Sequence, residues 1–226
     1  MADKKVMKKK LIPLGLLLIA SAIIGATGAT VIKNLSLANP IKPPTVEGKI
    51  EEKTGNQNQK EAWFENTGEA DVFLRVSYAE TWTVGSGDTA VLLPNQAENK
   101  SGGSIAAAAP AWNTEDWVKG QDGWWYYKNV LAGSKSKQQP DDNKKTSKLI
   151  TGVTFHTEDL KDSRYQTADY RLHFTMEVVQ ASDEAKVSQE AVKLLFGKEI
   201  TLPNSWPEGK YTTVLKWPAE ETAEID

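Results

Sequence analysis

The sequence of 226 residues contains no cysteine, and this absence restricts how the fold can be held together. Exported proteins often use disulfides, so a chain without cysteine must rely on the packing of its core alone. A single domain of this length can bury enough apolar surface for that purpose. The composition therefore predicts one folded domain with a substantial core.

Arginine is scarce, with three residues in the whole chain: Arg75, Arg164 and Arg171. The chain has 27 basic and 30 acidic residues, and its first 29 residues hold five lysines and one aspartate. The remaining residues would therefore carry a net charge of −7. Proteins that bind nucleic acid neutralise phosphates with clustered Lys and Arg, so this composition predicts no nucleic acid partner.

Histidine is limited to His156 and His173, and the chain has no HExxH motif. Zinc sites need three or four converging ligands, and two histidines in separate strand patterns do not supply them. The acidic run of Asp141, Asp142 and Asn143 lacks the glycine and the terminal glutamate of a calcium-binding loop. We therefore expect no metal, no cofactor and no catalytic residues.

The first 29 residues are typical of a secretory signal peptide. Five lysines between Lys4 and Lys10 precede an apolar run over residues 11–24, and small residues follow at 25–29. Cleavage is expected within residues 26–30, and we favour the bond after Ala29. The alternative is a retained anchor over residues 11–32, because about twenty apolar residues can span a bilayer. Cleavage predicts a secreted protein.

Residues 30–44 combine a short apolar segment with a linker marked by three prolines. In an extended strand Val31, Leu35 and Leu37 would share one face, and Ile32 would lie on the other. A tethered segment of this kind can add to the exposed edge of a sheet. The hypothesis is a donor strand that contacts another subunit through Val31, Ile32, Leu35 and Leu37. The alternative is a terminus that stays disordered or folds back on its own domain.

The sequence pattern of residues 45–218 is typical of an all-β domain, and an acidic tail follows over residues 219–226. Strict alternation predicts long strands at 71–83 and 169–180. Further strands are expected at 46–52, 59–65, 89–93, 149–156 and 211–217, with an aromatic hairpin over 112–117 and 123–130. A helix should begin at an N-cap at Ser182 and end near Gly197. Residues 102–110 and 132–148 are interpreted as surface loops.

Eight tryptophans are distributed along the chain, including the adjacent pair Trp124 and Trp125. In a strand these two side chains would point to opposite faces, one into the core and the other toward solvent or a partner. We expect at least half of the tryptophans to fill the core. Exposed aromatic rings can stack on sugars, so a polysaccharide-binding module is the alternative function.

Several stretches together resemble a known family of exported proteins. They read WFENTGEADVFLRVSY (63–78), GWWYYKNVL (123–131), LITGVTF (149–155) and YRLHFTMEVVQAS (170–182), and a short helix follows. This set is similar to the TasA/camelysin group of Gram-positive biofilm-matrix proteins, and within it to BsaA-type members processed by a SipW-type signal peptidase. The resemblance implies a jelly-roll-like antiparallel β-sandwich. The long insertion over residues 132–148 and the alanine-rich residues 102–110 depart from the pattern.

The resemblance also implies a function. It predicts a non-enzymatic, secreted structural subunit of a biofilm-matrix or surface fibre, in which the N-terminal segment of one subunit completes the sheet of the next. The expected partners are further copies of the chain, an accessory matrix protein or polysaccharide, and the signal peptidase during export. A polysaccharide-binding adhesin is the alternative. Camelysin-type relatives have been described as metalloproteases, which makes that activity the third option.

Overall fold

The structure is a computed structural model that describes residues 30–31, 50–51, 59–136 and 141–219. The predicted signal peptide with Ala29 lies outside the described residues, as do Ile32, Leu35 and Leu37 of the predicted donor strand. Most of the proline-marked linker and of the acidic tail lies outside them as well. The predictions for these segments therefore stay predictions.

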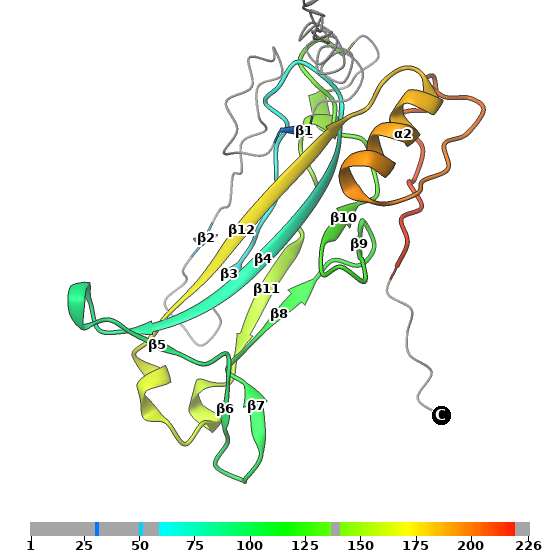
Figure 1. Cartoon of the computed structure of the whole chain (residues 1–226). Coiled ribbons are helices and arrows are strands. Elements are labelled where there is room, and N and C mark those ends of the chain that lie inside the picture. Colours follow the sequence, from blue (N-terminus) through cyan, green and yellow to red (C-terminus); the bar gives the residue numbers. More distant parts are fainter. Residues whose placement is uncertain (1–29, 32–49, 52–58, 137–140, 220–226) are drawn as a thin grey trace, which may run out of the picture.

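Two long antiparallel strands form the centre of the main sheet (Figure 1): β4 (Val72–Val84) and β12 (Asp169–Gln180). They pair along their whole length, from Asp169 opposite Thr83 to Gln180 opposite Val72. The sheet order is β1 (Thr30–Val31), β12, β4, β10 (Trp125–Tyr127) and β9 (Trp117–Lys119), and β5 (Val91–Leu93) also pairs with β4. The alternating side chains of both long strands place one set on each face of this sheet.

A second layer lies against one face of the main sheet. Its strands β8 (Ala108–Trp112) and β11 (Ile150–Phe155) pair with each other, and a bridge between Ala62 and Ile150 adds the chain near residue 62. Two small ribbons complete the strands: β2 (Ile50–Glu51) with β3 (Gln59–Lys60), and β6 (Gln96–Glu98) with β7 (Ser104–Ala106). The short 3-10 helices are η1 (Gly87–Thr89), η2 (Asp141–Lys144), η3 (Thr157–Asp159) and η4 (Ser163–Gln166).

The space between the two layers holds the first core. Trp82 is 1% exposed and lies with its ring centroid 4.9 Å from Tyr170, 5.4 Å from Tyr165 and 5.7 Å from Phe155. Such tilted and edge-to-face pairs add roughly 0.5–1.5 kcal/mol each beyond the burial of apolar area. The chain thus replaces disulfides with an aromatic core, as its composition requires.

The other face of the main sheet carries the second core, under helix α2 (Ala185–Phe196) and the chain that follows it. Phe73 and Val179 of the sheet pack with Val192 of the helix and with Trp206 and Trp217. The helix ends at Gly197, whose φ of 65° is the left-handed conformation that glycine adopts without steric cost. The predicted C-terminal end is confirmed. The N-cap is Glu184 rather than Ser182, whose Oγ accepts a hydrogen bond from the Glu184 N–H.

The fold is therefore an all-β, antiparallel β-sandwich with a single α-helix among its described residues, as predicted. The finer prediction of a jelly-roll-like connectivity stays a prediction. Figure 1 shows β1 and α2 at the same end of the two long strands, with β5, β6 and β7 at the other end.

Besides the N-cap, three local predictions are wrong. Residues 102–110 are not a loop, because β7 and β8 lie there and Ala107 and Ala108 are buried. Residues 211–217 form no strand; Leu215 and Trp217 are buried in the second core, so their alternation reflects burial rather than pairing. The ends of the predicted loop at 132–148 are also buried, at Ala132 and Thr146.

Candidate strand-acceptor edge

Strand β12 has a continuous partner on one side and, among the described residues, only a short partner on the other. On its outer side, among the described residues, β1 pairs only with Val178 and Val179. At the far end the Lys60 ammonium donates a hydrogen bond to the Tyr170 carbonyl oxygen at 2.6 Å. Between these points, no described strand pairs with the outer side of β12 over residues 171–177. This stretch is the candidate acceptor edge.

The side chains of this edge differ between its two faces. Leu172, Phe174 and Met176 point toward the second layer, where they are half-buried against the first core. Phe174 is held edge-to-face by Phe64, with ring centroids 5.6 Å apart. On the opposite face His173 and Thr175 are exposed. The inner face of the edge is thus an apolar row that is only partly covered by described residues.

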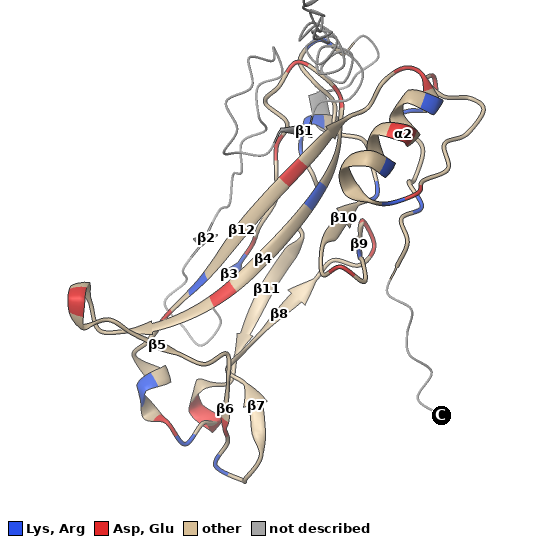
Figure 2. Cartoon of the chain, viewed as in Figure 1, with Lys and Arg blue, Asp and Glu red and all other residues tan. Residues whose placement is uncertain are grey.

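An ion pair fixes the end of this edge to the neighbouring strand. The guanidinium of Arg75 on β4 lies 2.5 Å from the Glu177 carboxylate on β12, and the two side chains are 12% and 16% exposed. Arg75 is also enclosed by the rings of Trp124 and Phe196, at 4.4 and 4.5 Å. The basic band of one strand beside the acidic band of the other is visible in Figure 2.

The same cluster continues to Asp122 in the turn between β9 and β10. Burial acts to raise the pKa of the Asp122 carboxyl, but hydrogen bonds from Tyr126 and Lys198 and from the Trp124 N–H bring it below its ordinary value. Burial, followed by the hydrogen bond to Asp122, raises the pKa of Tyr126 well above its usual range. The phenol therefore stays protonated and donates to Asp122 at 2.7 Å. These groups join the sheet to the start of the C-terminal segment.

Of the predicted donor residues, the structure describes Val31 alone, in β1, opposite Val178 of the same chain. For residues 30–31 the N-terminal segment therefore lies on the β12 edge in cis. Sequence reasoning proposed a donor but did not identify an acceptor. The alternation of residues 169–180 places Leu172, Phe174 and Met176 on one face, but the sequence does not show that this strand lies at an edge.

The two histidines do not come together. His173, on β12, lies with Nε2 3.0 Å from the Thr81 hydroxyl oxygen across the strand pair. His156 precedes η3, and its Nδ1 lies 3.9 Å from the Asp159 carboxylate. Within the described ranges, no group of three or more His, Cys, Asp or Glu side chains is placed to hold a metal ion. The acidic run beginning at Asp141 forms η2.

The tryptophans lie mainly in the two cores. Trp82, Trp117, Trp125, Trp206 and Trp217 are buried, and Trp63, Trp112 and Trp124 are half-buried. The prediction that Trp124 and Trp125 face opposite sides is confirmed, because Trp125 belongs to the first core and Trp124 packs against the second. Trp112 stacks on Trp125 with centroids 4.7 Å apart, and this packing covers one face of its ring. Polysaccharide binding stays a prediction.

Comparisons with known proteins add no relatives. No family model matches the chain, and neither a curated protein nor a solved structure matches it. In the part of the chain that is described, none of the helices has the length and apolar character needed to cross a membrane.

Proposed function

We propose that the protein is a secreted structural subunit of an extracellular fibre, in which the N-terminal strand of one subunit adds to the outer edge of β12 of the next. The observation that carries this proposal is the edge itself. Over residues 171–177 it has no strand partner among the described residues, and β1 already marks one end of it. Folded proteins normally protect such edges, so an edge that has no strand partner among the described residues needs an occupant.

The register of β1 supports the assignment of the occupant. Thr30 lies opposite Val179 and Val31 opposite Val178, in antiparallel orientation. If an added strand kept this register, Leu35 would lie opposite Phe174 and Leu37 opposite Leu172. The predicted inward face of the donor would therefore meet the half-buried row of the edge. Ile32 would lie opposite Glu177, on the face that carries the Arg75 ion pair.

Apolar contact and main-chain pairing would act together at this edge. Full burial of a Val or Leu side chain contributes about 1.5–3 kcal/mol, and strand addition also completes main-chain hydrogen bonds. Ordering each added residue costs about 1–2 kcal/mol, so a short segment pairs only when it is tethered or held at high local concentration. The same segment can pair in cis in a monomer or in trans in a fibre.

Disulfide trapping distinguishes pairing in cis from pairing in trans. The chain has no native cysteine that could form competing disulfides. Val31 and Val178 are directly opposite, and Cα atoms of opposite residues lie about 4.5–5.5 Å apart, within reach of a disulfide. The chain from Thr30 with Val31→Cys and Val178→Cys should give a ladder of covalent oligomers on a non-reducing gel. The matched control pairs Val31→Cys with Thr175→Cys, which stands on the other face, and should give no ladder.

Electron microscopy of the same preparations supplies the second readout. Fibres are expected from the chain that begins at Thr30 and not from a truncation that begins at Thr45. A covalent monomer without fibres would overturn trans addition and leave the strand on its own domain. Fibres from the Thr45 truncation would retain a structural role but place the subunit contact elsewhere. A monomer retained on an insoluble polysaccharide would favour the adhesin.

A further inference from the structure

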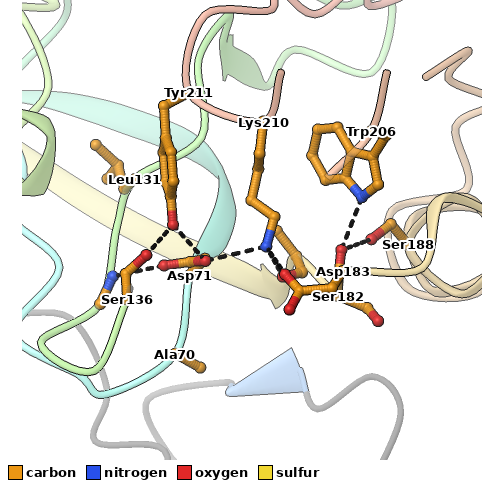
Figure 3. Close-up of polar contacts among 12 residues, drawn as sticks. Ala70, Asp71, Leu131, Ser136, Ser182, Asp183, Ser188, Trp206, Lys210 and Tyr211 are labelled. Atoms are coloured by element: carbon orange, nitrogen blue, oxygen red, sulfur yellow. Dashed lines mark hydrogen bonds and ion pairs between the residues drawn. The ribbon is translucent and has the colours of Figure 1, made fainter. Parts of the chain in front are cut away.

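A buried lysine and two aspartates meet where the C-terminal segment crosses the main sheet (Figure 3). Lys210 is 3% exposed, and its ammonium nitrogen lies 3.1 Å from Oδ2 of Asp71, just before β4. The same nitrogen contacts the Asp183 carboxylate and lies 3.4 Å from the Ala181 carbonyl oxygen. Lysines are almost never buried to this degree unless they are paired, and here both partners are aspartates.

The Asp71 carboxyl group is held by donors on both of its oxygens. The Tyr211 hydroxyl donates to Oδ2 at 2.6 Å, and the Gly133 N–H donates to Oδ1 at 3.0 Å. Burial and the hydrogen bond to Asp71 raise the pKa of Tyr211 above its ordinary value, which keeps the phenol protonated. The side chain of Asp71 is 11% exposed. Two fixed donors on a carboxyl group stabilise negative charge that develops on its oxygens during an attack on the carbon.

Asp183 differs from Asp71 in its exposure. Its side chain is 81% exposed while it contacts the buried ammonium of Lys210. The cluster thus holds an amine, a carboxyl group with polarised oxygens, and a separate carboxylate that reaches solvent. A pocket of about 440 Å³ adjoins the cluster and is lined by Asp71, Asp183, Lys210 and Tyr211 among others. Water can enter and leave through this pocket.

A permanent ion pair is a weak reason to bury these groups. Removing two charges from water costs about as much as their attraction returns, so buried ion pairs add little net stability. Held reactants, in contrast, gain from proximity, because a fixed amine and carboxyl group react as one unit. We infer that Lys210 and Asp71 form an intramolecular amide bond, which joins the C-terminal segment covalently to the sheet.

The reaction needs no partner from outside the chain. The Asp183 carboxylate accepts one proton from the Lys210 ammonium. It passes this proton through the pocket to the Asp71 carboxylate. The neutral amine then attacks Cγ of Asp71, while the Tyr211 hydroxyl and the Gly133 N–H stabilise the oxygens. The attacking nitrogen then gives up a second proton to the departing hydroxyl of Asp71, so a carbon–nitrogen bond forms, a carbon–oxygen bond breaks, and one water leaves. Overall an ammonium and a carboxylate become one amide and one water.

The link closes a long segment of chain. Lys210 and Asp71 are separated by 139 positions in the sequence, so the bond would span most of the described domain. A cross-link stabilises chiefly by restricting the unfolded chain, and longer closed segments gain more in that description. An amide would serve in place of the disulfides that this chain lacks. The inference stands on the Lys210 cluster alone and does not depend on the proposed fibre.

An intact-mass measurement tests the inference. The chain from Thr30 is first folded and is then denatured for the measurement. The wild-type protein should weigh less than its sequence by one water, and a digest should contain a branched peptide that joins the segments around Asp71 and Lys210. Asp71→Asn gives a second, chemically distinct signature. An asparagine side chain would form the same amide with loss of ammonia instead of water.

The control variant is Lys210→Arg, which keeps the positive charge but carries no amine that can form this amide. It should have its full sequence mass and no branched peptide. A wild-type chain at full sequence mass after prolonged incubation would overturn the inference, whether or not the variants fold. A loss of water that persists in Lys210→Arg would overturn it as well, because it would arise elsewhere in the chain.

Discussion

Replacing Arg75 with alanine tests whether this one cation holds α2 against the main sheet. The Arg75 guanidinium pairs with Glu177 at 2.5 Å and donates to the Phe196 carbonyl oxygen at 3.1 Å. It also lies between the rings of Trp124 and Phe196. The substitution therefore removes a contact to β12, one to the end of α2 and one to the turn before β10.

The largest part of the effect comes from the carboxylate that is left behind. Removing one partner of a buried ion pair costs about 3–5 kcal/mol, because the other charge stays buried without compensation. Glu177 is 16% exposed, which places the expected loss near the lower end, at about 3 kcal/mol. Each cation–π contact adds about 0.5–1 kcal/mol. We expect a total loss of about 4 kcal/mol, which corresponds to a fall of roughly 10 °C in Tm.

Urea unfolding followed by tryptophan fluorescence measures this loss, since five tryptophans are buried. Arg171→Ala is the matched control, because its guanidinium is 68% exposed and lies 3.7 Å from Asp169. That change should cost less than about 0.5 kcal/mol, as exposed pairs do. The double variant Arg75→Met, Glu177→Gln should recover part of the loss. A cost below about 1 kcal/mol for Arg75→Ala would refute the assignment of a buried, uncompensated charge.

Two further predictions concern the turn residues that fix the layers. Gly133→Ala should lower the free energy of unfolding by about 3 kcal/mol in chemical denaturation, because the added Cβ would lie 2.2 Å from the Glu69 carbonyl oxygen. Gly152→Ala is the control and should leave stability unchanged, because its Cβ would meet no atom within 4 Å. Asp122→Asn should cost about 0.5–1 kcal/mol at pH 7. The folded pKa of Asp122 is lowered, so melts across pH should show this cost shrinking as pH falls below the ordinary value of about 3.8 and disappearing below the lowered folded pKa.

The long elements of the fold could be predicted because their signal is local. The strand predicted at 169–180 is found with these bounds as β12, and the strand predicted at 71–83 is found one residue later as β4. Alternation over a dozen residues leaves little choice of secondary structure. The helix end at Gly197 was predictable for a similar reason, since one residue type tolerates the left-handed conformation.

The misread segments share a different cause, because tertiary packing decided their structure. The alanines at 107 and 108 resemble low-complexity sequence, yet they are buried, and Ala108 pairs with Phe155 of β11. Leu215 and Trp217 alternate as a strand would, but they fill the second core without pairing. The alternation of Leu215 and Trp217 indicates burial correctly without revealing which neighbour provides it, whereas the pattern at residues 107–108 indicates no burial at all.

The two sites were the least predictable features, because each depends on residues that are distant in the sequence. An edge strand is defined by the neighbour that it lacks, and no property of residues 171–177 reports that. The Lys210 cluster brings together positions from three parts of the chain, of which Asp71 is 139 positions from Lys210. Lysine and aspartate are ordinary surface residues in any sequence pattern, and only the fold shows that these are buried.

The two proposed sites lie close to each other at one end of β12, although each is argued from its own observations. The described pairing of β1 reaches Val179, and two residues later the Ala181 N–H donates to the Asp71 carbonyl oxygen at 2.8 Å. In the proposed fibre, a pull on an added strand would enter the subunit at this end of β12. The amide between Asp71 and Lys210 would lie there, where it ties the sheet to the segment that covers the second core. A chain without cysteine would thus carry its covalent link at the point where tension in the fibre is transmitted to the subunit.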